Sequence, residues 1–297
     1  NDYSYGCSHP VLQPYCDSKC LLYKYKNLDE ETNILNADEM VNKLIEHYTS
    51  DFTDRSFDLK DIFTFMPKKH LFTSGQLITL IGDTGLGKTA FISYIITQLP
   101  KIKILFLSLE VDDITMSRRF LQASMKKSKT ETLQLLRSGD MDLIKKAKKS
   151  IEHIKLETIS PDIQDLASFV AESESKIVVV DTIDRIPAKY AGKDDFARQE
   201  VIANGLKDLA MKEDVIVLAV HHISKSASYN FKETNTLDVH SGKGNSAIEQ
   251  KSDQYIAFQG KEISKARVVK SLKARDESKF ELLLNYDWDT FTFDKRN

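Results

Sequence analysis

The residues from Gly82 to Thr89 have the types and the spacing of a phosphate-binding loop. They read GDTGLGKT and fit the pattern G-x-x-x-x-G-K-[ST]. In such a loop the glycines let backbone N–H groups surround a phosphate, the lysine contacts the outer phosphates and the last hydroxyl binds magnesium. The alternative is an ordinary glycine-rich turn. The motif assigns a bound nucleotide to Gly82, Asp83, Thr84, Gly85, Leu86, Gly87, Lys88, Thr89 and Ala90.

The elements expected on either side of this run favour a phosphate site. Residues 77–81 (LITLI) form a short apolar run typical of a buried strand. Residues 90–99 (AFISYIITQL) predict a largely buried helix, which Pro100 ends. A strand, a glycine-rich loop and a helix in this order are the setting that the motif requires.

Later apolar runs end in residues that can act on a phosphate. Glu110, Asp181 and the pair His221 and His222 each follow such a run. Doubly wound sheets bind their ligands at the carboxyl ends of parallel strands, so these side chains are expected to share one edge of the sheet. Asp181 closes the run KIVVV and fits the Walker B pattern, in which an aspartate supports magnesium. The alternative for Asp181 is a turn or helix-cap residue.

The alternation of strands and helices predicts an α/β fold with a mostly parallel sheet and helices on both faces. Helices are expected within 113–150, where the basic residues are interpreted as a solvated face, and at 163–173. The polar segment 224–247 is predicted to be a loop. Strands are predicted at 77–81, 102–109, 154–159, 176–181 and 214–220, followed by antiparallel strands at 255–258, 266–272, 280–284 and 291–293.

The composition indicates a globular protein. The chain has 297 residues, of which 41% are hydrophobic, and this is enough for one large α/β domain with a small appendage. With a formal net charge of −2, a nucleic-acid site has to come from local clusters of lysine. No apolar run approaches the ~20 residues of a membrane span, and no signal peptide is recognisable. A cytoplasmic protein is therefore expected, and the start at Asn1 suggests a piece of a longer polypeptide.

The cysteines lie together in the first residues of the chain. Cys7, His9, Cys16 and Cys20 offer three thiolates and an imidazole, which would complete a tetrahedral zinc site. The alternative is scattered free cysteines, since a disulfide is not expected in the cytoplasm. The expected domains are a zinc-binding segment at 1–28, a linker with a helix at 29–56 and the main domain at 57–297.

An amphipathic helix is predicted in the linker. Asn36 can cap it, with Glu39 three residues later completing a capping box. The apolar stripe would pack either on its own domain or on a neighbouring subunit. It consists of Ala37, Met40, Val41, Leu44, Ile45 and Tyr48.

Several segments together resemble the RecA-type motor of DnaB-like hexameric replicative helicases, in particular those of phage primase-helicases and the mitochondrial helicase Twinkle. The resemblance runs in order through residues 57–294. Its segments are SGQLITLIGDTGLGKTAFI, ILFLSLEV, KIVVVDTIDRI, VLAVHHISK, GNSAIEQKSDQYIAF and SLKARDESKFELLLNYD.

The resemblance implies ATP hydrolysis with magnesium. Lys88 would bind the phosphates, Thr89 and Asp181 the metal, and Glu110 would polarise the attacking water. His222 stands where the family senses the outermost phosphate, although it can also be read as a buried histidine bonded to the backbone. Tyr286 lies where some relatives stack a base, although a strand position is the alternative.

The resemblance also implies a ring, most often a hexamer, around single-stranded DNA. Lys225, Lys232 and Lys243 are the candidates for DNA phosphate contacts, and a solvated loop is the alternative. Lys273 and Arg275 match the family's Lys-x-Arg, whose arginine reaches the nucleotide of the adjacent subunit. A primase or primase-polymerase upstream fits the same family. The other possible functions are a RecA-type or clock-protein-type ATPase without unwinding activity and a loader that does not hydrolyse nucleotide.

Overall fold

The computed structural model describes residues 35–49, 55–191, 194–234, 236–244 and 246–296, with side chains at 46–49 and at 190 left out. Contacts divide the chain into a unit that ends at Asp51 and a larger unit from Phe52 to Asn297. The predicted zinc ligands Cys7, His9, Cys16 and Cys20 lie outside the described residues. The predicted division at 1–28, 29–56 and 57–297 stays a prediction.

The linker helix is α2 (Ala37–Thr49), and it begins as the sequence predicts. The Asn36 side chain accepts a hydrogen bond from the Glu39 N–H at 3.0 Å, and the Glu39 carboxylate accepts one from the Asn36 N–H at 2.8 Å. This reciprocal pair is a capping box. Met40, Val41 and Leu44 on the apolar stripe are 48 to 55% exposed.

A single nine-stranded sheet forms the centre of the larger unit. Its strand order is β11-β10-β9-β8-β3-β7-β6-β4-β5, and the strands from β8 to β5 run parallel. The strands are β3 (Leu77–Gly82), β4 (Ile104–Ser108), β5 (Ile154–Glu157), β6 (Ile177–Asp181), β7 (Ile216–His222), β8 (Gln254–Gly260), β9 (Ala266–Ala274), β10 (Glu281–Asp287) and β11 (Thr292–Lys295).

The antiparallel extension begins one strand later than predicted. β8 runs parallel to β3, and only β9, β10 and β11 are antiparallel to their neighbours. The connection after β7 is long enough to carry the chain from the carboxyl ends of the parallel strands back to their amino ends before β8 starts. β8 therefore runs in the same direction as β3. The tight turns between the later strands allow only antiparallel pairing.

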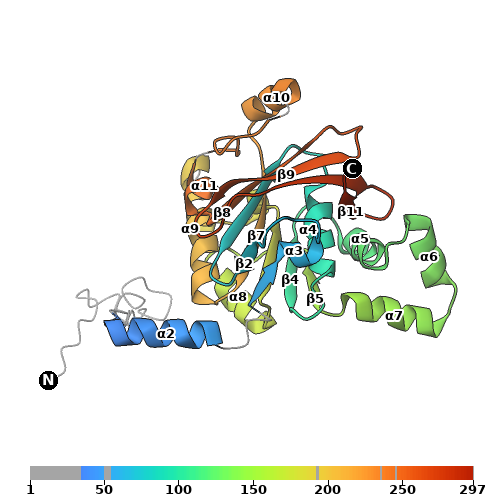
Figure 1. The fold of residues 1–297 in the computed structure, drawn as a ribbon, viewed down its shortest axis with the longest axis horizontal. Coiled ribbons are helices and arrows are strands. Elements are labelled where there is room, and N and C mark those ends of the chain that lie inside the picture. The colour runs from blue at the N-terminus through green and yellow to red at the C-terminus, as the bar shows by residue number, and fades with distance from the viewer. Residues whose placement is uncertain (1–34, 50–54, 192–193, 235, 245, 297) are drawn as a thin grey trace, which may run out of the picture. The chain divides into compact units, whose positions relative to one another are not determined.

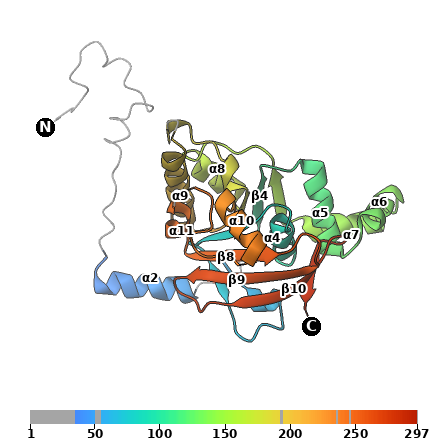
Figure 2. The same cartoon turned by 90° about the horizontal axis from the view of Figure 1, so that it is seen from above.

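Helices cover both faces of this sheet. Figure 1 shows it between α4 and α5 on one side and α9 and α11 on the other, and Figure 2 gives the same arrangement from above. The predicted helical region 113–150 contains three separate helices. The helices are α4 (Lys88–Thr97), α5 (Asp113–Met125), α6 (Lys129–Arg137), α7 (Met141–Ile151), α8 (Leu166–Ser173), α9 (Asp195–Lys212), α10 (Lys225–Thr234) and α11 (Ala247–Lys251), with short 3-10 turns η3 (Ile183–Arg185) and η4 (Lys189–Ala191).

A small two-stranded sheet precedes the main one. It pairs β1 (Ser56–Asp58) with β2 (Leu71–Thr73), and α3 (Leu59–Ile62) lies between them in the chain. Phe57 and Phe72 meet edge to face across it, with ring centroids 5.0 Å apart. In the part of the chain that the structure describes, no helix is long and apolar enough to cross a membrane.

The segment 224–247 is not a continuous loop as predicted, because α10 occupies its first half. Its composition is polar, but Phe231 is buried and Ala227 packs against the core, so one face of the helix is anchored. The chain returns towards β7 through a bridge between Ile223 and Gly242.

Candidate nucleotide-binding site

The glycine-rich loop lies between β3 and α4, as the motif requires. Gly85 and Gly87 have φ angles of 79° and 100°, which L side chains rarely adopt. A Cβ atom at Gly87 would also lie 2.9 Å from Tyr286 Cε1. Two independent constraints, backbone conformation and a close neighbour from β10, therefore require glycine at this position.

Lys88 is the first residue of α4, and its side chain is only 6% exposed. Its Nζ donates hydrogen bonds to the carbonyl oxygens of Gly82 at 2.9 Å and Asp83 at 2.8 Å. Burial lowers the pKa of Lys88 to about 8, against the opposing attraction of Asp181 and Asp83. The lysine is therefore a buried cation held at the inner side of the loop.

Thr89, which follows Lys88 in α4, forms a pair with Asp181 at the end of β6. The Thr89 hydroxyl donates to the Asp181 carboxylate at 2.7 Å. Burial raises the pKa of Asp181, although the hydrogen bond from Thr89 opposes the shift. A hydroxyl beside a buried carboxylate is a set of oxygen ligands that suits Mg²⁺, and a cation bound there would favour the charged form of the carboxyl group.

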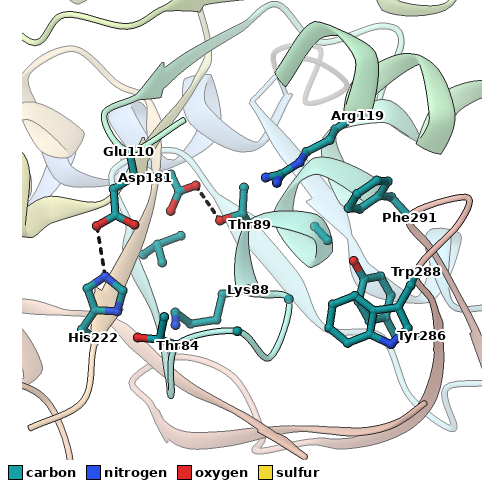
Figure 3. A pocket seen from close by; sticks show the side chains of 14 residues that line it. Thr84, Lys88, Thr89, Glu110, Arg119, Asp181, His222, Tyr286, Trp288 and Phe291 are labelled. Atoms are coloured by element: carbon teal, nitrogen blue, oxygen red, sulfur yellow. Dashed lines mark hydrogen bonds and ion pairs between the residues drawn. The ribbon is translucent and has the colours of Figure 1, made fainter. Parts of the chain in front are cut away.

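Glu110 and His222 contact each other in the wall of the same cavity. The His222 Nε2 and Glu110 Oε1 atoms are 3.3 Å apart, and Arg185 Nε lies 3.8 Å from the same carboxylate oxygen. Among the described residues, the buried Nδ1 atom of His222 has no hydrogen-bond partner. Figure 3 shows Lys88 between this pair and the aromatic residues on the other side.

The C-terminal strands and α5 complete a cavity of about 200 Å³. Arg119, Trp288 and Phe291 line it in addition to the predicted residues. Arg119 was expected on a solvated face, but burial lowers the pKa of its guanidinium and its Cζ lies 5.4 Å from the Phe291 ring centroid. No local pattern distinguishes this arginine from Arg118, the other basic residue of the same helix.

The aromatic wall has a buried and an exposed ring. Tyr286 is 1% exposed and stacks on Phe293 with centroids 4.6 Å apart, so it is mainly a core residue that also supports Gly87. Trp288, the single tryptophan of the chain, is 39% exposed, and its ring centroid is 4.3 Å from that of Tyr286. Trp288 therefore presents a ring to the cavity.

Lys273 and Arg275 do not line this cavity. Lys273 Nζ donates to the carbonyl oxygens of Glu249 at 2.7 Å and Gln250 at 3.0 Å. Arg275 donates to the Asp253 carboxylate at 3.1 Å and to the Gln250 carbonyl at 2.7 Å. The predicted catalytic residues thus fall into two groups within one chain.

The predicted DNA-contacting lysines are also divided. Lys225 and Lys232 lie on α10, whereas Lys243 pairs with Asp184, with Nζ and Oδ1 atoms 3.3 Å apart. His221 Nδ1 lies 3.5 Å from the other Asp184 oxygen. Burial raises the pKa of Asp184, but the neighbouring His221 and the charge of Lys243 outweigh it, so the net pKa is lowered.

Comparison with known proteins agrees with this geometry. The profile of a family described as "AAA domain" matches residues 68–228 of the 297, which is more than half of the chain. The chain belongs to this family. Among curated proteins, none matches the chain.

Solved structures share the fold at low sequence identity. A solved "ATPase Domain" aligns with a TM-score of 0.70 and 14% identity over 89% of this chain and 100% of that one. "The Structure Of A DnaB-Like Replicative Helicase And Its Interactions With Primase" aligns with a TM-score of 0.68 and 16% identity over 92% of this chain and 71% of that one. "Crystal structure of the RadB recombinase" aligns with a TM-score of 0.50 and 13% identity over 76% of this chain and 93% of that one. The predicted fold, a RecA-like α/β fold with a mostly parallel sheet and helices on both faces, is confirmed.

Proposed function

We propose that this AAA-domain protein is the motor of a DNA helicase, which hydrolyses ATP to move along single-stranded DNA in a replication system of a phage, plasmid or other mobile element. The observation that carries the proposal is one cavity that brings together Lys88, the Thr89 and Asp181 pair, and the Glu110 and His222 pair. These groups come from the start of α4, from the ends of β6 and β7 and from the residues just after β4. Together they fit a nucleoside triphosphate with Mg²⁺.

Each residue has a defined part in this mechanism. Lys88 holds the outer phosphates, and Thr89 with Asp181 would hold Mg²⁺, which supplies charge neutralisation on the phosphates when bound. Glu110 accepts a hydrogen bond from water and orients it in line with the phosphate. His222 contacts Glu110 and can exchange that contact for the outermost phosphate. His222 is the last residue of β7, so a movement of its side chain would shift the segment that leads into α10.

Two features support assembly into a ring, with a hexamer as the expected form. The cavity holds acidic and basic groups but lacks Arg275, which would have to come from a second copy. The second is the apolar stripe of α2, with Met40, Val41 and Leu44, which we expect to dock on a neighbouring subunit in the ring. In such a ring, Lys225, Lys232 and Lys243 would contact DNA phosphates. Lys243 would leave Asp184 to do so.

A recombinase or regulatory ATPase is the second candidate, since the fold is also similar to that of the RadB recombinase. A zinc site at Cys7, His9, Cys16 and Cys20, a primase upstream and a cytoplasmic location stay predictions.

Unwinding of forked DNA is the experiment that tests the proposed function. We expect the protein with ATP and Mg²⁺ to separate a fork with two single-stranded tails and to leave a blunt duplex intact, because translocation needs a single strand to start on. Release of a labelled strand is the measurement. ATP turnover that single-stranded DNA stimulates without any strand release would favour the recombinase or regulatory function instead.

Nucleotide binding is expected to weaken above pH 8. The pKa of Lys88 is about 8 in the free protein, and the negative phosphates raise it in the complex, so binding takes up a proton once Lys88 has lost its own. Affinity should be flat below the lysine pKa and then fall by up to about tenfold for each pH unit above it. Calorimetric titration with ADP between about pH 6.5 and 9.5 measures this. A Lys88→Met variant should bind weakly without this dependence, and a flat wild-type profile would contradict the assignment.

A further inference from the structure

Arg267, in β9, is a fully buried arginine without a carboxylate partner. Its side chain is 0% exposed, and among the described residues it forms no ion pair. Arginine is almost never fully buried unless it is paired, because taking a charge out of water is costly. Burial accordingly lowers the pKa of this guanidinium. A buried charge with this cost calls for a compensating role.

The contacts of Arg267 lead to the phosphate-binding loop. Its Nε donates to the Leu86 carbonyl at 2.7 Å. Its Nη1 donates to the Ala266 carbonyl at 2.8 Å, to that of Lys261 at 3.2 Å and to that of Ser264. One guanidinium therefore joins the loop between β3 and α4 to the turn between β8 and β9.

The same guanidinium lies behind the aromatic wall of the cavity. Its Cζ is 5.5 Å from the Tyr286 ring centroid and 5.2 Å from that of Trp288. Gly260, the cross-strand partner of Arg267, leaves room for this side chain, since a Cβ there would lie 2.9 Å from Arg267 Cδ. The position is thus enclosed by β8 on one side and by two rings on the other.

The contact with Leu86 fixes one peptide of the loop. In a trans peptide the C=O of one residue and the N–H of the next point in opposite directions. Because the Leu86 carbonyl is directed at Arg267, the Gly87 N–H is directed away from it, and Gly87 lines the cavity. A cation on the carbonyl also polarises the peptide and strengthens its N–H as a donor.

We propose that Arg267 is a positioning residue for the phosphates of the nucleotide, and this rests on the proposed function of the cavity. It orients the Leu86–Gly87 peptide so that its N–H binds phosphate, and its uncompensated charge adds to the positive potential there. The anionic phosphates then offset part of the cost of burying Arg267. The effect should increase with the number of phosphates on the ligand and should not act on the nucleoside.

The test compares ligands that differ only in phosphate number. Binding of adenosine, AMP, ADP and ATP to the full chain is measured by calorimetry, and the fluorescence of the single tryptophan, Trp288, gives a second readout. We expect Arg267→Met to lose about 10- to 100-fold in ADP and ATP affinity, by analogy with the loss when a residue that supports a metal ligand is removed, with little change for adenosine. Arg267→Lys keeps the charge and should show an intermediate, equally graded loss.

Arg198→Met is the matched control. Among the residues that the structure describes, Arg198 also donates only to backbone carbonyls, those of Asp184 at 3.1 Å and Ile186 at 2.6 Å, which are outside the phosphate-binding loop. In Arg198→Met, any loss of affinity should be the same factor for all four ligands. The same uniform loss in Arg267→Met, or unchanged ADP affinity in both Arg267 variants, would overturn the proposal. If Arg267→Met does not fold, the grading in Arg267→Lys decides. A wild-type chain that binds no nucleotide would instead refute the proposed function.

Discussion

Replacing Lys88 by alanine is expected to abolish ATP turnover while leaving the fold intact. Lys88 lies at the inner side of the phosphate-binding loop, with its Nζ on the Gly82 and Asp83 carbonyls. Removing one preorganised group that stabilises transition-state charge costs about 10²- to 10³-fold in turnover, and the weaker binding of ATP adds to this. Phosphate release under excess ATP and Mg²⁺ is the measurement.

The fold should survive because Lys88 is not a stabilising residue. Its pKa falls from 10.5 to about 8 in the folded chain, so below that pH the protein keeps the ammonium charged at a cost of about 3 kcal/mol. Alanine removes this cost along with the aliphatic part of the side chain. The thermal unfolding midpoint of Lys88→Ala should therefore be equal to or above that of the wild type.

Lys129→Ala is the control for this prediction. Lys129 is likewise the first residue of its helix, α6, but it is exposed and outside the cavity. Its loss should change neither turnover nor stability beyond a few tenths of a kcal/mol. Wild-type turnover in Lys88→Ala, or a fall in the unfolding midpoint that accounts for the lost activity, would refute the assignment.

The sequence predicts those parts of the site that local pattern determines. Apolar runs that end in polar residues identify β4, β6 and β7, and in parallel strands their carboxyl ends have to meet at one edge. Glu110, Asp181 and His222 are therefore recognisable together from the order of residues alone, and the glycine spacing identifies the loop. Their side chains line one cavity.

The remaining residues depend on strand order, which no local pattern encodes. Trp288 reaches the cavity because β10 follows β9 and β8 outward from β3. Arg119 is one of two adjacent arginines on α5, and only packing against Phe291 distinguishes it from Arg118. Arg267 could have been noticed, because it alternates in phase with the buried Val269 and Ser271, where an arginine is out of place.

Removing Arg275 is expected to lower turnover by about 10³- to 10⁵-fold, the contribution of an arginine finger to phosphoryl transfer. Within its own chain this guanidinium lies on Asp253 and the Gln250 carbonyl, outside the cavity, and its side chain is 46% exposed. An exposed arginine beside a strand end can extend to an adjacent copy. Arg275→Ala should therefore retain nucleotide binding by each subunit and lose hydrolysis.

Mixed rings separate a finger that acts in trans from a structural arginine. A Glu110→Gln subunit has an intact Arg275, and an Arg275→Ala subunit has an intact Glu110, so a ring of both contains complete interfaces. With equal random mixing of head-to-tail subunits, about one quarter of the interfaces are complete, and turnover should recover to that order. Mixing Arg275→Ala with the double variant Glu110→Gln/Arg275→Ala should restore nothing, because no finger is available. Equal activity in the two mixtures, with assembly verified by light scattering, would place the action of Arg275 within its own subunit.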